Sequence, residues 1–266
     1  MHPAFDTIAS GYDASFTHSL IGSAQREIVL RYLEKSFLQQ VKLNILELNS
    51  GTGEDALWFA KRGHKVLATD ISEKMIGIIR GKIDVIDLSS QIQTMKLDIC
   101  EIQKTNFEEG FDLIFSNFGG MNCISLNVMK SLPAVLTKLL KPNGRLIMVI
   151  MPKYCFWETK YFLLKFNLKK AFRRYSKKET IANLNGQELR AFYHNPGQIK
   201  KIFKKYFNVI TVKPVGFFIP PTYLGKFFES KKRIFNLLKR SENLITNQSY
   251  LAGFSDHYLI DFQVKE

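Results

Sequence analysis

The sequence predicts an α/β protein whose sheet is mostly parallel and is covered by helices on both faces. Short apolar runs alternate with segments of helical periodicity from residue 44 to residue 151, which is the pattern of repeated strand and helix units. The first apolar run ends in a glycine-rich turn that opens a helix. Two later runs, at 207–213 and 257–264, supply a sixth and a seventh strand.

Five strands are expected before residue 152. Helical spacing is expected between them at 54–61, from Glu73 onward with Ser72 as its cap, and at 133–140. The five strands are expected at 44–48, 65–70, 93–97, 111–116 and 145–151.

The chain divides into four expected regions. Helical periodicity is expected throughout 153–193, and 199–206 is expected to form another short helix. The regions are an N-terminal helical cover at 1–42, the core at 43–151, a basic helical lid at 152–206, and the last two strands with a second basic insert at 207–266.

The composition predicts a folded protein that needs no disulfides or structural metal. Of the 266 residues, 45% are hydrophobic and 23% are charged, and a chain of this length can bury a sizeable core. Cys100, Cys123 and Cys155 form no Cys-x-x-Cys pair, so we expect a reducing compartment and no metal site. The sequence has no signal-peptide pattern and no run near the roughly 18 apolar residues of a membrane span. We therefore expect a cytoplasmic protein, and the sequence sets no oligomeric state.

The net charge of +14 lies entirely in the C-terminal part of the chain. Residues 1–150 hold 16 Lys+Arg and 16 Asp+Glu, whereas residues 151–266 hold 22 and 8. Such asymmetry indicates an anionic partner, for example nucleic acid, phospholipid headgroups or an acidic ligand. The alternative is a solvated basic surface.

The segment from Glu47 to Ala56 indicates a nucleotide-like ligand. Its glycines, Gly51 and Gly53, let the backbone turn sharply and present amides at a helix N-terminus. The pattern also fits a dinucleotide fingerprint, and Asp70 can hold a ribose in either case. The glycines alone do not decide between the two ligands.

Three features favour a cofactor that contains an amino acid. Glu47 has no role in pyrophosphate binding but suits an ammonium group. A helical segment that contains Tyr12 precedes the first strand and can fold over a site. The fourth strand ends at Asn117, at the carboxyl edge of the sheet, where ligands of open α/β folds bind.

Acidic, glycine and amide residues recur here at the spacing of a known family. They are Glu47-x-Asn49-x-Gly51-x-Gly53, followed by Asp70, Asp98 and Asn117. Over residues 5–151 this pattern resembles the class I S-adenosylmethionine-dependent methyltransferases, in particular the small-molecule branch that includes quinone and biotin-precursor methyltransferases. The resemblance implies a Rossmann-like sheet of six parallel strands and an antiparallel seventh. Asn49 replaces the family's first loop glycine, and asparagine tolerates the left-handed backbone well.

The resemblance also implies a cofactor, S-adenosylmethionine, with S-adenosylhomocysteine as its product. The backbone from Asn49 to Gly53 would line the methionine moiety, and Glu47 would hold the loop or the ammonium group. Asp70 would accept hydrogen bonds from both ribose hydroxyls. Tyr12 would close over the cofactor.

The adenine would lie between Ile71 and Met75. Ile99 would lie beside the ring, and Asp98 would accept a hydrogen bond from the adenine amino group. Other interpretations remain open: Asp70 as a helix cap, Met75 as core and Asp98 as a turn residue.

Three residues are catalytic candidates: His194, Asn117 and His257. Asn117 would face the sulfonium methyl group. If the acceptor is a phenol or an acidic carbon, a base near neutrality accelerates the transfer, and histidine is the first candidate. His194 follows the lid, and His257 opens the last strand beside Asp256. Loop packing and a structural pair with Asp256 are the respective alternatives.

The two inserts indicate the type of acceptor. In the lid, Leu164, Leu168 and Phe172 are spaced four apart beside a row of Lys165, Lys169 and Arg173, and 226–240 repeats this pattern. Basic amphipathic helices of this kind lie in membrane interfaces, although a core-facing stripe with a solvated rim gives the same pattern. We expect methyl transfer to an oxygen or carbon of a small hydrophobic or aromatic acceptor. One form of this hypothesis has a lipid-linked acceptor and an anionic membrane surface as partner.

The main alternative is an RNA methyltransferase that uses the basic C-terminal part. It ranks lower because the fourth strand ends in Ser116-Asn117-Phe118-Gly119 and lacks the Asn/Asp-Pro-Pro-aromatic signature of amino-adenine methylation. A non-catalytic module that binds the cofactor and a nicotinamide oxidoreductase are further alternatives.

Overall fold

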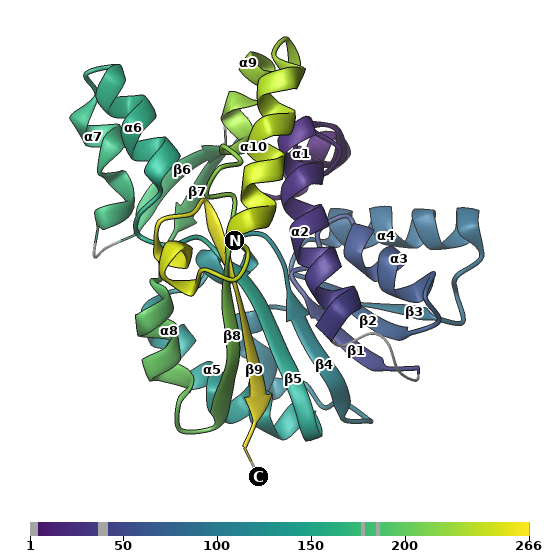
Figure 1. Cartoon of the computed structure of the whole chain (residues 1–266). Coiled ribbons are helices and arrows are strands. Elements are labelled where there is room, and N and C mark those ends of the chain that lie inside the picture. Colours follow the sequence, from purple (N-terminus) through teal and green to yellow (C-terminus); the bar gives the residue numbers. More distant parts are fainter. Residues whose placement is uncertain (1–4, 37–41, 177–178, 185–186, 266) are drawn as a thin grey trace.

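A seven-stranded sheet forms the centre of the computed structural model, which describes residues 5–36, 42–176, 179–184 and 187–265 (Figure 1). The strand order is β3-β2-β1-β4-β5-β9-β8. The strands are β1 (Asn44–Leu48), β2 (Lys65–Asp70), β3 (Ile92–Lys96), β4 (Phe111–Ser116), β5 (Leu140–Ile150), β8 (Phe207–Val215) and β9 (His257–Val264).

The pairing directions confirm the predicted sheet. Strand β1 pairs in parallel with β2 and with β4, and β4 pairs in parallel with β5. Strand β9 is antiparallel to both of its neighbours, β5 and β8. The chain order reverses between β1 and β4, where Leu48 lies opposite Ser116. This carboxyl end of β1 and β4 is where open α/β sheets bind ligands.

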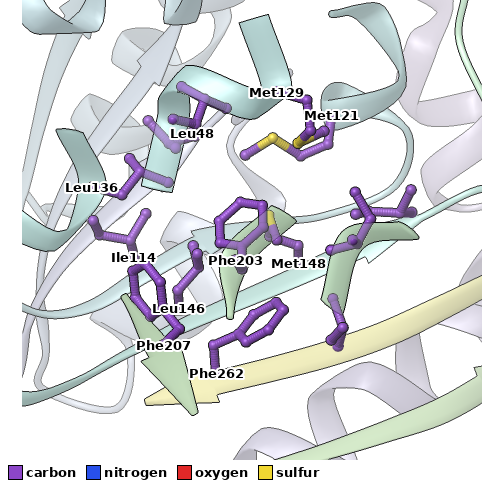
Figure 2. Close-up of a cluster of buried hydrophobic side chains, with 14 of the residues drawn as sticks. Leu48, Ile114, Met121, Met129, Leu136, Leu146, Met148, Phe203, Phe207 and Phe262 are labelled. Carbon is purple, nitrogen blue, oxygen red and sulfur yellow. The ribbon is translucent and has the colours of Figure 1, made fainter. Parts of the chain in front are cut away.

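Helices cover both faces of the sheet (Figure 1). Because side chains alternate along a strand, Ile45 packs against α2 (Leu20–Ser36), α3 (Glu54–Ala60) and α4 (Glu73–Ile86). Its neighbour Leu46 packs toward α5 and α8 on the other face. Figure 2 shows part of that second core, where Phe203, Phe207 and Phe262 meet beneath α8. The two helices are α5 (Leu126–Leu139) and α8 (Pro196–Phe203).

Helices and helical turns precede the first strand and follow β2, β3 and β4. The Ser72 hydroxyl caps α4 by accepting a hydrogen bond from the Met75 amide at 3.1 Å, as predicted. Helix α1 (Phe5–Tyr12) and the π-helical turn Asp13–Thr17 precede α2, and the 3₁₀ turns Ile99–Lys104 and Gly120–Cys123 follow β3 and β4.

The first insert differs from its predicted form. It begins with α6 (Phe156–Leu164) and α7 (Leu168–Ala171), but β6 (Thr180–Leu184) and β7 (Gln187–Ala191) then form an antiparallel hairpin. The expectation of helical periodicity throughout 153–193 is therefore wrong at its C-terminal end. The sequence pair Asn185-Gly186 between the two strands is a strong hairpin signal.

The second insert is helical. It consists of the turn Thr222–Leu224, α9 (Gly225–Glu229), α10 (Lys232–Ile245) and the turn Ser249–Gly253. Figure 1 shows α6, α7 and α9 projecting beyond the end of the sheet at which its parallel strands finish. Among the described residues, every helix is too short or too polar to span a bilayer.

Candidate cofactor and active site

The loop after β1 is a bend of left-handed residues. Asn49, Gly51 and Gly53 have φ values of 56°, 55° and 80°, a region that favours glycine and admits asparagine. A Cβ atom added at Gly53 would lie 2.8 Å from Ile79. Gly53 is therefore required both by its backbone conformation and by its packing against α4.

The side chain of Asn49 is accommodated by a second glycine. A Cβ atom added at Gly120 would lie 2.4 Å from the Asn49 Cβ atom, so this space is available only because residue 120 has no side chain. The Ser116 hydroxyl donates a hydrogen bond to Asn49 Oδ1 at 3.4 Å. The asparagine at the family's glycine position is thus matched by Gly120 in the loop after β4.

Asp70 connects the glycine bend to the loop after β2. Its Oδ2 atom accepts a hydrogen bond from the Gly51 amide at 2.9 Å, and its Oδ1 atom accepts one from the Ser72 amide at 2.9 Å. Burial raises the pKa of Asp70 above its ordinary value, against the opposing effect of the backbone amides. Each carboxylate oxygen has a second lone pair, so these bonds leave capacity for ribose hydroxyls.

Glu47 carries a buried oxygen atom that fits an ammonium group. The residue is 2% exposed, and among the described residues its Oε2 atom has no hydrogen-bond partner. Burial raises the pKa of Glu47 well above its ordinary value, and the nearby Asp55 adds to this while Arg26 opposes it. An unsatisfied buried carboxylate is costly alone, and the amino group of S-adenosylmethionine would satisfy it.

A buried polar network adjoins Glu47. Arg26 of α2 forms an ion pair with Asp55 Oδ1, and the Asn117 side chain donates a hydrogen bond to Asp55 Oδ2 at 2.8 Å. Asn117 Oδ1 accepts a hydrogen bond from the Phe118 amide at 3.1 Å. The amide of Asn117 therefore holds the loop after β4 against α3. Sequence reasoning missed Arg26 and Asp55, although Asp55 lies within the glycine segment.

The N-terminal helices cover both loops of the candidate cofactor site. The Tyr12 ring lies 3.8 Å from the position of a Cβ atom on Gly51. Asp6 accepts a hydrogen bond from the Ser72 hydroxyl. Tyr12 thus lies beside the glycine bend.

A charged cluster fastens the π-helical turn to the same loop. Asp13 accepts a hydrogen bond from the Thr52 hydroxyl at 2.5 Å, and the Lys82 ammonium lies 2.7 Å from Asp13 and 2.5 Å from Glu54. Asp13, His18 and Glu54 place one potential metal-ligand atom each within 4.8 Å of one another. Lys82 already supplies a positive charge to the two carboxylates of this group.

The adenine candidates lie after β2 and β3, which are neighbouring strands. The Leu97 amide donates a hydrogen bond to the Asp70 carbonyl at 2.9 Å, which brings the two strand ends together. Asp98 caps the next 3₁₀ turn by accepting a hydrogen bond from the Cys100 amide at 2.8 Å. The apolar candidates are Ile71, which is half-buried, and the buried Met75 and Ile99.

His257 contacts Phe118, the residue after Asn117, and lies next to a buried carboxylate. Its Nδ1 atom is 3.3 Å from Asp256 Oδ2, and its ring meets the Phe118 ring edge-on with centroids 5.2 Å apart. Although burial alone raises the pKa of Asp256, His257 and Arg174 together lower it below its ordinary value. Asp256 is thus an ionised partner for the histidine.

His194 lies on the opposite face of the sheet. Its carbonyl accepts a hydrogen bond from the Tyr258 hydroxyl at 2.8 Å, and Tyr258 belongs to the core beneath α5 and α8. Because neighbouring side chains on a strand point to opposite faces, His257 points the other way, toward Phe118. Burial lowers the pKa of His194 to about 4. The structure does not bring the two histidines into one site.

A second buried network ties the first insert to β9. Glu158 of α6 accepts hydrogen bonds from Arg173 at 2.7 Å and from Arg174 at 3.1 Å. Arg174 also donates to Asp256 Oδ1 at 2.8 Å. The residue beside His257 is therefore fixed by the lid. Sequence reasoning placed Arg173 in a cationic row and missed this network.

The fold and these loops define a class of protein. A sheet with one antiparallel strand next to its edge, a left-handed bend after β1 and an acid at the end of β2 constitute the class I S-adenosylmethionine-dependent methyltransferase fold.

The comparisons with known proteins agree with this class. A family model described as a methyltransferase domain matches residues 45–144. A putative methyltransferase of Bacillus subtilis (strain 168), YqeM, is 30% identical over 149 residues, which cover 54% of this chain and 53% of the relative. The matching part thus spans about half the length of that curated relative.

Three solved structures have the same fold at low sequence identity. The CcbJ methyltransferase from Streptomyces caelestis has a TM-score of 0.63 at 13% identity, covering 99% of this chain and 98% of that one. An S-adenosylmethionine-dependent methyltransferase from Clostridium acetobutylicum has a TM-score of 0.61 at 13% identity, covering 98% and 99%. The magnesium protoporphyrin IX methyltransferase from Synechocystis PCC 6803, with bound S-adenosylhomocysteine, has a TM-score of 0.57 at 16% identity, covering 92% and 85%. Residues 45–144 therefore match a methyltransferase domain, and the chain has the fold of S-adenosylmethionine-dependent methyltransferases.

Proposed function

We propose that this protein transfers a methyl group from S-adenosylmethionine to an oxygen or carbon of a small hydrophobic or aromatic acceptor. One observation carries the acceptor class, namely a series of ring contacts from the glycine bend to His257. The centroid distances are 5.5 Å for Tyr12–Phe16, 5.8 Å for Phe16–Phe118 and 5.2 Å for Phe118–His257. Aromatic side chains in such a series favour flat, apolar ligands.

Residues at the carboxyl ends of β1, β2 and β3 hold the cofactor in this proposal. Glu47 receives the ammonium group, Asp70 accepts from the ribose hydroxyls, and Asp98 accepts from the adenine amino group. When bound, the sulfonium supplies an electrophilic methyl group. The protein's own task is then mainly to orient the acceptor toward it, which alone gives a large acceleration.

His257 is the proposed general base. The ionised Asp256 lies 3.3 Å from its Nδ1 atom. The geometry there is not that of a hydrogen bond, but the negative charge favours the tautomer with a proton on Nδ1, which leaves Nε2 to accept a proton from the acceptor hydroxyl. His194, whose burial lowers its pKa to about 4, is neutral at physiological pH but lies on the other face of the sheet.

The proposal includes an anionic membrane surface as the source of a lipid-linked acceptor. The basic inserts support this, because residues 151–266 carry all of the +14 net charge and the inserts lie beyond the carboxyl edge of the sheet (Figure 1). The same charge would suit RNA, so RNA belongs among the substrates tested.

A substrate screen tests the proposal. Purified protein would be incubated with S-adenosylmethionine carrying a labelled methyl group and, separately, with phenols, quinones, carboxylates, lipid extract or bulk RNA. We expect label in organic-extractable product from the phenol, quinone or lipid samples. Label found only in RNA would contradict the proposed acceptor class.

A further inference from the structure

We propose that the tips of the two C-terminal inserts penetrate the headgroup region of an anionic membrane, so that the cofactor edge of the sheet faces the bilayer. This inference rests on the proposed function, because a lipid-linked acceptor would then enter from the membrane. It adds the residues that make the contact and the orientation of the protein on the surface.

The first tip is the turn between α6 and α7. Leu164, Phe166 and Leu168 are 72%, 94% and 64% exposed. Three large apolar residues within five positions form a contiguous exposed patch of a kind that marks interaction sites. Most of the surface of these three side chains is therefore open to water in the described structure.

Phe166 combines this exposure with an unusual backbone conformation. Its φ is 53°, a left-handed conformation that is unusual for a bulky residue and that glycine adopts without penalty. The turn itself is well formed, since the Phe166 amide donates to the Leu163 carbonyl at 2.9 Å and Asn167 caps α7. Because the Phe166 residue is 94% exposed, its side chain contributes little packing within the described chain. Such positions are characteristic of functional contacts.

The charges around this tip are complementary to anionic lipid. Within 156–171 the lysines at 160, 165, 169 and 170 are exposed. The only acid of this segment, Glu158, is buried and paired with Arg173 and Arg174. An exposed apolar tip ringed by ammonium groups matches an anionic membrane interface, where each nearby cation strengthens binding.

The second tip lies on α9 and the start of α10. Phe227, Ile234 and Leu237 are 54%, 50% and 63% exposed. The cations that accompany them are exposed too, namely Lys226, Lys231, Lys232 and Arg233. The second insert therefore repeats the combination of apolar and cationic residues.

Aromatic contacts hold the two inserts together. The Tyr223 ring lies 5.8 Å from Tyr161 and 6.1 Å from Phe162, and Trp157 lies 6.1 Å from Phe228. Figure 1 shows α6, α7 and α9 on the same side of the molecule, beyond the carboxyl edge of the sheet. In this proposal both tips contact the same membrane surface.

Sedimentation with lipid vesicles tests the proposal. The full chain would be mixed with vesicles of phosphatidylcholine alone or with phosphatidylglycerol, and we expect retention on the anionic vesicles that weakens with salt. The double variant Leu164→Asp/Phe166→Asp should weaken retention by at least about tenfold. Val85→Asp is the matched control, because Val85 is 84% exposed on α4, away from the inserts, and it should be retained like the wild type.

The variant Phe166→Gly separates a membrane role from a folding role. Because glycine suits a positive φ, we expect the Tm to rise by a few degrees while retention on anionic vesicles falls. Retention equal to that of the wild type in both tip variants, or a wild-type protein that binds bulk RNA but not vesicles, would overturn the proposal. Binding of S-adenosylhomocysteine, measured on the same preparations, distinguishes a failure of membrane docking from a failure of the proposed activity.

Discussion

Glu47 combines deep burial with an unsatisfied oxygen atom beside the glycine bend. In the free protein burial raises the pKa of this carboxyl group, whereas a bound ammonium group favours the ionised form. Binding of S-adenosylhomocysteine should therefore release a proton, and the affinity should fall as the pH falls through the raised pKa of the free protein.

Glu47→Gln tests this role. The variant should bind S-adenosylhomocysteine about 10- to 100-fold more weakly at neutral pH, as expected for losing a hydrogen bond to a charged group, and its affinity should vary less with pH. Calorimetry in two buffers with different heats of ionisation measures both the affinity and the proton release. Equal affinity and equal proton release in the variant and the wild type would contradict the assignment.

Gly120 leaves the space that the Asn49 side chain occupies. Gly120→Ala should weaken S-adenosylhomocysteine binding and lower the free energy of unfolding by about 1–3 kcal/mol, because the new methyl group would collide with Asn49. Adding Asn49→Gly removes the collision and leaves a residue suited to the positive φ. A double-mutant cycle of unfolding and binding measures the coupling, and additive effects would show that the two positions are independent.

The two histidine candidates make opposite predictions. With an acidic hydroxyl acceptor, His257→Gln should lower kcat about 10²- to 10⁴-fold, the usual contribution of a general base. S-adenosylhomocysteine binding serves as the folding control for each variant. A larger loss of kcat in His194→Gln than in His257→Gln would contradict the assignment of the base to His257.

At the scale of elements, Glu242 joins α10 to the segment after β8. Its Oε1 atom accepts hydrogen bonds from the Gly216 and Phe217 amides, and its Oε2 atom accepts them from Phe218 and Ile219, at 2.6–3.1 Å. Burial raises the pKa of Glu242 above its ordinary value, against the effect of these four amides. One side chain thus satisfies four consecutive backbone donors that would otherwise be buried without partners.

Glu242→Gln should therefore destabilise the second insert. The amide NH₂ group of the glutamine faces two backbone N–H donors and cannot accept hydrogen bonds from them. We therefore expect the free energy of unfolding to fall by about 3 kcal/mol. Urea unfolding measures the change, and Glu229→Gln, at an exposed position on α9, should change the free energy of unfolding by less than about 0.5 kcal/mol. Equal stabilities of the two variants would contradict the role of Glu242.

The strands of the main sheet were predicted from local patterns, whereas the hairpin was missed and the ion pairs were not predictable. β1, β2, β4 and β9 have the predicted bounds because each is a short apolar run between polar or turn residues. The hairpin β6–β7 was missed because the helical spacing of the basic, aromatic residues before it was extended across the Asn185-Gly186 pair. Local sequence therefore sets element type well only where a single periodicity dominates.

Some parts of the candidate site were also predictable from the sequence, whereas others were not. Motif spacing located the glycine bend and Asp70, because these residues lie at strand ends. Arg26 and Asp55 are 29 positions apart, and Arg174 and Asp256 are 82 apart. Which arginine meets which carboxylate depends on the packing of the helices against the sheet, and a single sequence does not encode this in any local pattern.

At the scale of the whole molecule, charge and chemistry are separated along the chain. The cofactor loops lie in the electrically balanced residues 1–150, and all of the excess positive charge lies in residues 151–266. The network of Glu158, Arg174 and Asp256 lies beside His257 within residues 151–266. Gln25 of α2 joins the first part to this network by donating a hydrogen bond to Asp256 Oδ2 at 3.1 Å. Residues of the first basic insert are thus linked by ion pairs to Asp256, which adjoins the proposed base His257.

Calorimetric titration of the purified protein with S-adenosylhomocysteine, alongside NADH, tests the central claim most directly. The geometry of Glu47, the left-handed bend and Asp70 predicts saturable one-site binding of S-adenosylhomocysteine, a higher Tm in its presence, and no heat with NADH. Binding of NADH without binding of S-adenosylhomocysteine, or no binding of either ligand, would contradict it.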